Sequence, residues 1–126
     1  MPKQVPDVPR GVTPIGPYSI ATEANGFVFI SGQIPLDPGS SRLVGDDART
    51  QAGRVMDNIR LVLEDLDLEF DDVVKTTIFL ADMSDFPDVN EVYGSYFSGG
   101  PPARATVQAG ALPGGALVEI EAIAAR

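Results

Sequence analysis

The apolar positions change their spacing along the chain, and each spacing predicts an element. Five segments are rich in β-branched and aromatic residues, as strands are. They are residues 18–22, 27–31, 73–80, 104–109 and 117–124. The first two are joined through Asn25-Gly26, a pair suited to the positive φ angles of a tight hairpin turn. We therefore expect an antiparallel hairpin near the N-terminus.

Two further segments carry the helical period. In residues 46–66 apolar side chains recur every three or four positions, which places them on one face, while the opposite face carries mixed charges. Residues 86–97 repeat this spacing, after a start marked by Ser84 or Asp85, and the Gly/Pro run at 99–102 ends the segment. Both segments are predicted to be amphipathic helices.

The order strand, strand, helix, strand, helix, strand, strand predicts an α+β fold with two helices on one face of a sheet. The other face also needs a cover, because residues 73–80 are apolar on more than one side. We expect an oligomer to bury that face. A monomer whose free sheet face is partly apolar is the alternative.

The chain has 126 residues, of which 44% are hydrophobic, so we expect a single domain over residues 1–126. Five of the first 17 residues are prolines, which predicts an extended N-terminal segment. Residues 1–13 are expected to fray at their start, with order beginning near Ile15. No apolar run is long enough to cross a bilayer or to act as a secretory signal, so we expect a cytoplasmic protein without a membrane partner.

The amino-acid composition limits the catalytic and ligand-binding groups that the chain can use. Eighteen acidic against nine basic residues give a net charge of −9, which repels the phosphate backbone of nucleic acids, so we expect no nucleic-acid partner. Cysteine is absent, which excludes disulfides, thiolate catalysis and Cys-ligated metals. Histidine is absent too, so the usual metal ligand and the usual neutral-pH base are missing. We expect no metal, and chemistry that uses carboxylates, Arg, Tyr, Ser, Thr, backbone groups and water.

Arg104 is the most informative single residue. It is the only basic residue between Lys75 and Arg126, and it begins an otherwise neutral strand. A guanidinium needs an anion, and its planar fork matches a carboxylate with two hydrogen bonds. Arg104 taken alone favours an internal salt bridge, with a carboxylate-bearing ligand as the functional interpretation.

Glu119 and Glu121 lie two residues apart on the last strand, so they share one face about 7 Å apart. Such a spacing suits a general acid–base pair. The simpler interpretation is that a half-exposed strand alternates charged and apolar residues. Either glutamate is also a possible partner of Arg104.

Four further residues are weaker candidates. The ring of Tyr18 could close a pocket, and Ser31-Gly32 would let a backbone amide approach a small ligand. Asn90 could hydrogen-bond a ligand from the second helix. Taken separately, these residues are more simply explained by edge packing, a turn and solvent exposure, respectively. As a set, with one arginine and one glutamate, they suit a small, intrinsically reactive carboxylate-bearing molecule that water attacks.

Six segments resemble the motifs of the RidA (YjgF) family, in order and at similar spacing. They are Ile15-Gly16-Pro17-Tyr18-Ser19, Phe29-Ile30-Ser31-Gly32-Gln33-Ile34-Pro35-Leu36-Asp37, Val73-Val74-Lys75-Thr76-Thr77-Ile78-Phe79-Leu80, Val89-Asn90-Glu91-Val92-Tyr93, Pro102-Ala103-Arg104 and Val118-Glu119-Ile120-Glu121-Ala122-Ile123. The resemblance extends from about residue 14 to residue 125.

This resemblance implies a chorismate-mutase-like α+β sandwich with a mixed sheet, assembled as a homotrimer with three active sites between subunits. It implies a 2-iminobutanoate/2-iminopropanoate deaminase, a hydrolase acting on C–N bonds. The substrates of that family are carboxylate-bearing enamines and imines such as 2-aminoacrylate, which pyridoxal-phosphate enzymes produce. The products are 2-keto acids and ammonia, and the protein itself needs no cofactor.

The resemblance also assigns roles. The arginine matching Arg104 binds the substrate carboxylate and the glutamate matching Glu119 positions the attacking water, which leaves Glu121 structural. The other pocket residues are Tyr18, Ser31, Gly32, Asn90 and Thr106. Thr106 stands where the family often has Cys, and activity should survive if only its backbone carbonyl contacts the water. An imine is already electrophilic, so orientation and proton transfer matter more than a strong nucleophile.

Two other functions stay open at this level. One is a noncatalytic trimeric binder of small 2-keto or amino acids, which the same arginine would serve. The other is an RNA-directed role, since members of this family have been described as translation inhibitors and ribonucleases. The acidic charge and the absence of histidine weigh against the RNA-directed role.

Overall fold

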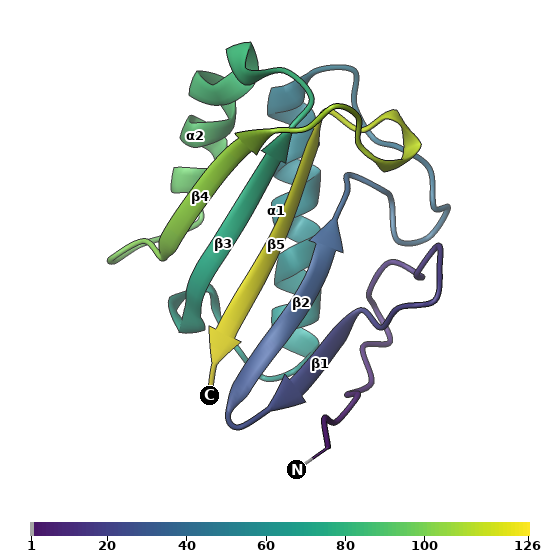
Figure 1. Ribbon diagram of the computed structural model, residues 1–126, viewed down its shortest axis with the longest axis vertical. Helices are drawn as coiled ribbons and strands as arrows, with labels where there is room; N and C mark the ends of the chain where they lie inside the picture. Colours follow the sequence, from purple (N-terminus) through teal and green to yellow (C-terminus); the bar gives the residue numbers. More distant parts are fainter. Residues whose placement is uncertain (1) are drawn as a thin grey trace.

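A computed structural model describes residues 2–126. Within these residues, five strands and two α-helices follow one another as the sequence predicts (Figure 1). In chain order they are β1 (Ala21–Ala24), β2 (Phe27–Gln33), α1 (Ala48–Asp65), β3 (Val73–Leu80), α2 (Phe86–Gly94), β4 (Ala103–Gln108) and β5 (Val118–Ala125).

The strands form one mixed sheet in the order β1-β2-β5-β3-β4. β3 and β4 are parallel and are connected through α2, whereas the other neighbouring strands are antiparallel. Both helices lie behind the sheet in Figure 1, so one face is covered and the other is open. The predicted α+β fold, a mixed sheet with two helices on one face, is confirmed.

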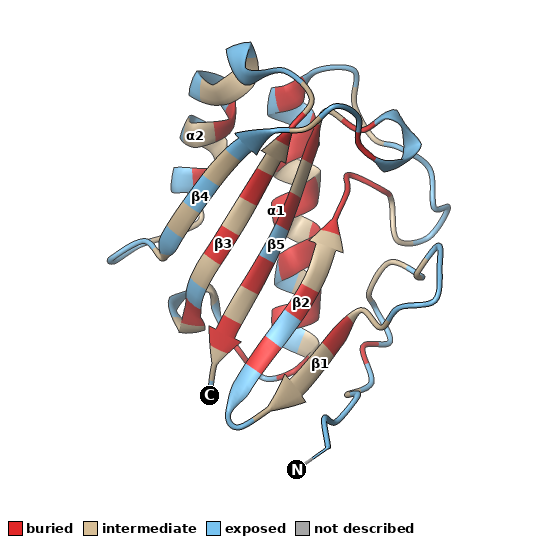
Figure 2. Ribbon diagram, viewed as in Figure 1, coloured by how far each residue is buried: buried red, intermediate tan, exposed pale blue. Residues whose placement is uncertain are grey.

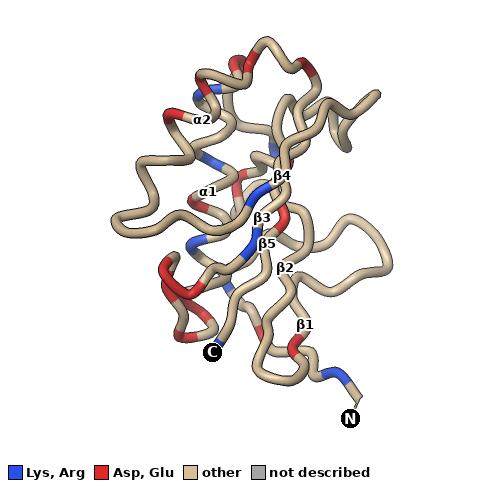
Figure 3. Tube along the Cα trace, turned by 60° about the vertical axis from the view of Figure 1, so that its left-hand side comes forward, with Lys and Arg blue, Asp and Glu red and all other residues tan. Residues whose placement is uncertain are grey.

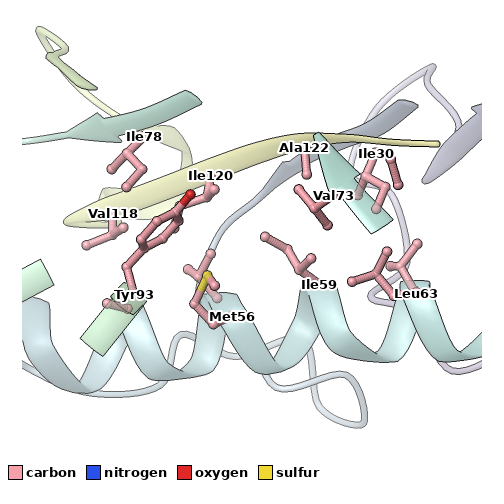
Figure 4. Packing of buried hydrophobic residues seen from close by; sticks show 14 of the residues in the cluster. Ile30, Met56, Ile59, Leu63, Val73, Ile78, Tyr93, Val118, Ile120 and Ala122 are labelled. Atoms are coloured by element: carbon pink, nitrogen blue, oxygen red, sulfur yellow. The ribbon is translucent and has the colours of Figure 1, made fainter. Parts of the chain in front are cut away.

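Helix α1 provides most of the covering layer. Its N-terminus is capped by Asp47, whose side chain accepts a hydrogen bond from the amide of Thr50 at 2.7 Å. Figure 4 shows its Met56, Ile59 and Leu63 pointing at the apolar side chains of the sheet. All three are 1% exposed, and burying such a side chain stabilises the fold by about 1.5–3 kcal/mol. Among residues 2–126, neither helix combines the length and the apolar composition that crossing a membrane requires.

The central strand β5 shows why the sheet has two different faces. Val118, Ile120 and Ala122 are at most 2% exposed and face the helices. Glu119 and Glu121 alternate with them and therefore lie on the open face, as the period of two predicts. The same alternation of buried and more exposed residues is visible along β3 and β5 in Figure 2.

The open face exposes large apolar side chains. Phe27 and Phe29 on β2 are 44% and 42% exposed, and Val107 on β4 is 43% exposed. Each alternates with residues that face the helices, so all three belong to the open side. The single chain therefore has an open sheet face with exposed apolar side chains, the kind of face that we expect an oligomer to bury.

The first hairpin forms around the predicted turn, where Asn25 and Gly26 have φ angles of 53° and 81°. Strand β1 begins at Ala21, however, and not at residue 18. A bulge in β2 between Ile30 and Gln33 interrupts the ladder there. Ser31 then reaches the preceding segment by single hydrogen bonds, to the carbonyl oxygen of Ile20 through its amide and to that of Ser19 through its hydroxyl.

Helix α2 is shorter than its apolar pattern. It ends at Gly94, and the chain continues in a tight turn through Tyr96 and Phe97, whose amides bond to carbonyls three residues earlier. Both rings still pack against the core. Periodicity therefore identified the apolar side chains correctly but placed the helix end three residues too late.

The N-terminal segment is ordered earlier than the expected start near Ile15. Gln4 pairs with Glu23 of β1 through two backbone hydrogen bonds of 2.9 Å, and Val8 is 8% exposed. Arg10 then bonds to Asp65 at the end of α1, at 2.6 Å. The prolines favour an extended backbone that can lie along an edge strand, and the segment makes tertiary contacts that the sequence did not reveal.

Candidate active site

Arg104 lies on the edge strand β4 and points toward the helices. The central carbon of its guanidinium is 5.5 Å from the centre of the Phe86 ring and 5.1 Å from that of Tyr93, both on α2. It makes no ion pair and no side-chain hydrogen bond with any residue in the range 2–126. The internal salt bridge that Arg104 alone favoured is therefore absent from the described chain, and neither Glu119 nor Glu121 is its partner.

Two other candidates lie on the same side of the sheet. Thr106 is two residues along β4, and its Oγ1 is buried without a hydrogen-bond partner in the structure. Asn90 is half-buried on α2, four residues after Phe86 and three before Tyr93, so it shares the helix face that meets Arg104. Arg104, Asn90 and Thr106 thus form one group at the β4 edge, which we call the arginine half-site.

Glu119 is on the opposite face of the sheet. It is half-buried on β5, and burial, followed by repulsion from Glu121, raises the pKa of its carboxyl above the ordinary value. A Cβ placed on Gly32 would collide with its carboxylate, with the carboxyl carbon only 2.9 Å away. Glycine at position 32 is therefore what allows Glu119 to pack closely against the bulge of β2.

Gly32 also borders a small hollow, which Ile15 and Tyr18 line with it. Ser31 precedes Gly32 in β2. The Tyr18 side chain is exposed and its hydroxyl accepts a hydrogen bond from the amide of Ile15 at 3.3 Å, while the Ser31 hydroxyl donates to Ser19 at 2.6 Å. Glu119, Gly32, Ser31 and Tyr18 form what we call the glutamate half-site.

One chain does not bring the two half-sites together. Arg104 is directed to the helix side at one edge of the sheet, whereas Glu119 is on the open side of β5, with β3 between the two strands. The seven predicted site residues therefore fall into two groups in the single chain. Figure 3 shows the basic positions on β3 and β4 at the edge where the arginine half-site lies.

Phe86, Tyr93 and Thr76 were not among the predicted site residues. The apolar spacing assigned the two rings to the core, which is correct for Tyr93 at 4% exposure, but it does not show that both contact Arg104. Their separation of seven residues, two helical turns, was the available signal.

Larger hollows lie elsewhere. One of about 240 Å³ is bordered by Arg60, Phe70 and Tyr96 on the helix layer and contains none of the predicted site residues. Within residues 2–126, no group of three or more Asp, Glu, His or Cys side chains is placed to hold a metal ion.

Comparison with known proteins gives a consistent family. The profile of the family described as Endoribonuclease L-PSP matches residues 9–126. Protein DfrA of Myxococcus xanthus is 56% identical over 112 residues, which cover 87% of this chain and 86% of that protein. A mouse protein named 2-iminobutanoate/2-iminopropanoate deaminase is 49% identical over 110 residues, 87% of this chain and 82% of its own. The human protein of that name is 46% identical and covers 87% and 80%.

Solved structures of this family have the same fold as this chain. RidA from an Antarctic Psychrobacter superposes with a TM-score of 0.91 at 37% identity, covering 98% of both chains. TdcF from E. coli with bound serine superposes with a TM-score of 0.90 at 34% identity, again covering 98% of both. The chain belongs to the Endoribonuclease L-PSP family, which is the RidA (YjgF) family.

Proposed function

We propose that the protein hydrolyses carboxylate-bearing imines and enamines of the 2-aminoacrylate type to 2-keto acids and ammonia. The mouse and human relatives bear the name of this activity. The observation that carries the proposal is Arg104, a half-buried cation that no carboxylate within residues 2–126 neutralises. Such a cation at the edge of a sheet is available for an external carboxylate.

Arg104 binds the substrate carboxylate through its planar fork of N–H donors. The unpaired hydroxyl of Thr106 on the same side of β4 and the side chain of Asn90 provide further polar groups beside it. A buried hydroxyl without a partner is costly, and a bound ligand or its water would satisfy it.

Glu119 holds the attacking water. The water oxygen adds to the imine carbon while one water proton passes through Glu119 to the imine nitrogen. The remaining hydroxyl proton then moves to the same nitrogen as the C=O bond forms, so the C–N bond breaks and ammonia leaves. A glutamate with a raised pKa is a better proton acceptor than an ordinary one near neutral pH and exchanges protons more readily there. Tyr18, Ser31 and Gly32 line the glutamate half-site.

The two half-sites meet between neighbouring copies in a homotrimer. Two observations support this arrangement: the half-sites are separated within one chain, and the open face exposes Phe27, Phe29 and Val107. Apolar patches of this kind mark protein interfaces. Three active sites per trimer follow, each with Arg104 from one copy and Glu119 from the next.

The test is the lifetime of an imine made in place by an amino-acid oxidase, with semicarbazide as the competing trap. Arg104→Ala should abolish the acceleration while the trimer persists. Arg49→Ala, which removes an exposed arginine paired with Glu91 on the helix layer, is the matched control and should leave the rate unchanged. An imine lifetime that the folded wild-type trimer does not shorten would reject the proposal.

The second candidate is a noncatalytic trimeric binder of small 2-keto or amino acids. The structure of E. coli TdcF with bound serine favours it, because that relative holds an amino acid. The binder would show saturable binding of serine or a 2-keto acid that depends on Arg104 and is not accompanied by ammonia release.

A further inference from the structure

The guanidinium of Arg104 rests on two aromatic rings of α2. Its central carbon is 5.5 Å from the ring centre of Phe86 and 5.1 Å from that of Tyr93, within the range of a cation–π contact. We call these two rings the aromatic seat. Because Phe86 and Tyr93 are seven residues apart on one helix, α2 presents both rings to the same strand.

The Tyr93 ring is itself fixed. It is 4% exposed, and its hydroxyl forms a 2.6 Å hydrogen bond with the Oγ1 of Thr76, which is 3% exposed. Thr76 is the register partner of Arg104 in the parallel pairing of β3 and β4. The strand neighbour of Arg104 therefore anchors the ring on which Arg104 rests, and Phe97 packs against that ring at 4.9 Å between centres.

This support differs chemically from a salt bridge. A carboxylate partner would occupy the N–H donors of the guanidinium, whereas contact with a ring uses the electrostatic attraction between the cation and the aromatic system. The seat can thus limit the movement of Arg104 and leave its donors available. No residue among 2–126 occupies them.

We propose that Phe86, Tyr93 and Thr76 are positioning residues that hold the Arg104 guanidinium ready to receive the substrate carboxylate. The proposal rests on the carboxylate-binding role given to Arg104 above. It adds that recognition of the carboxylate depends on three residues that act through Arg104.

The experiment compares binding of 2-oxobutanoate with binding of its neutral methyl ester, by ligand-observed NMR on the intact protein. The factor by which the acid binds more tightly measures the contribution of a well-placed Arg104. In Phe86→Leu this factor should fall about tenfold, the scale of a desolvated cation–π contact. The KM for the imine should rise by a similar factor, with a smaller change in kcat.

Conservative variants separate positioning from general stability. Phe86→Tyr keeps a ring under Arg104 and should keep the preference for the acid, and Tyr93→Phe, which frees the ring from Thr76, should lower it less than Phe86→Leu does. The matched control is Tyr96→Leu, since that ring lies over Arg60 at 4.9 Å and its hydroxyl bonds to Asp57 on α1. Tyr96→Leu should leave the preference for the acid unchanged.

The positioning role of the aromatic seat would be wrong if folded Phe86→Leu kept the wild-type preference for the acid. It would also be wrong if Tyr96→Leu lost as much of this preference as Phe86→Leu. These measurements need no turnover, so they stand apart from the proposed hydrolysis. A wild type that prefers the acid but does not shorten the lifetime of the imine rejects the hydrolysis and leaves the seat supported.

Discussion

Glu119 shows how the position of one carboxyl sets its proton affinity. It is half-buried on the open face of β5, and Glu121 lies two residues along on the same side. Burial and then the like charge raise the pKa of Glu119. The folded chain therefore binds a proton that the unfolded chain would release, so this residue lowers the stability as pH rises from its ordinary pKa through its raised one.

The first prediction concerns this pair. In Glu121→Gln the repulsion disappears, the pKa of Glu119 falls, and the acidic limb of the pH profile of kcat/KM should move to lower pH. Glu91→Gln, which removes one charge from exposed α2, is the control and should not move the limb. A limb that stays in place in Glu121→Gln would show that Glu119 does not titrate in the reaction, or that Glu121 does not affect it.

At the scale of elements, the bulge of β2 brings Gly32, which has no side chain, close to β5. Gly32→Ala should push the Glu119 carboxylate aside, because the new Cβ would collide with it. The colliding atoms are at the end of a flexible side chain, so we expect a small change in Tm and a loss of activity of about tenfold or more, as misplaced catalytic groups produce.

Gly53→Ala is the matched control for this substitution. A Cβ at position 53 in α1 meets nothing within 4 Å, and replacing a helical glycine by alanine should stabilise the protein by about 0.5–1 kcal/mol. The thermal unfolding and imine turnover of both variants test this prediction. Full activity in Gly32→Ala would show that Glu119 does not need this approach to the bulge.

The same scale explains what could be predicted from the sequence. Residues 73–80 match β3 at both ends, because a β-branched run between an acidic turn and a new helix start has few alternatives. The faces of β5 followed from its period of two. The side of the sheet to which Arg104 points did not, since that depends on which residues of α2 cover β4. The division of the site into two halves is a property of this packing.

At the scale of the whole molecule, the densest group of acidic residues and the exposed apolar side chains of the sheet lie on different surfaces. The chain carries a net charge of −9, and in Figure 3 acidic positions cluster in the connection between α1 and β3. The open face carries Glu119 and Glu121 on β5 but also exposes the apolar side chains of Phe27, Phe29 and Val107. Copies that meet through this face avoid placing their most acidic surfaces against each other, which favours self-association through the sheet.

The last prediction follows from this arrangement. Phe29→Lys introduces one like charge per copy, three per trimer, on the proposed interface, so the protein should sediment near its chain mass of 13.3 kDa, whereas the wild type should sediment near three times that mass. Activity should be lost in the same variant, because the half-sites no longer meet. Met83→Lys, an exposed apolar residue before α2, is the control. A fully active monomer would show that one chain contains a complete site.

The place of β5 in the sheet has a further consequence for biosynthesis. β5 follows the other four strands in the sequence, yet it lies between β2 and β3, where it pairs with both. Until β5 has been synthesised, β2 and β3 lack their common neighbour and the apolar face of α1 lacks its central partner. The sheet therefore closes late in synthesis, and Glu119 joins the glutamate half-site in that same step, so chains that stop before β5 are expected to be both unstable and inactive.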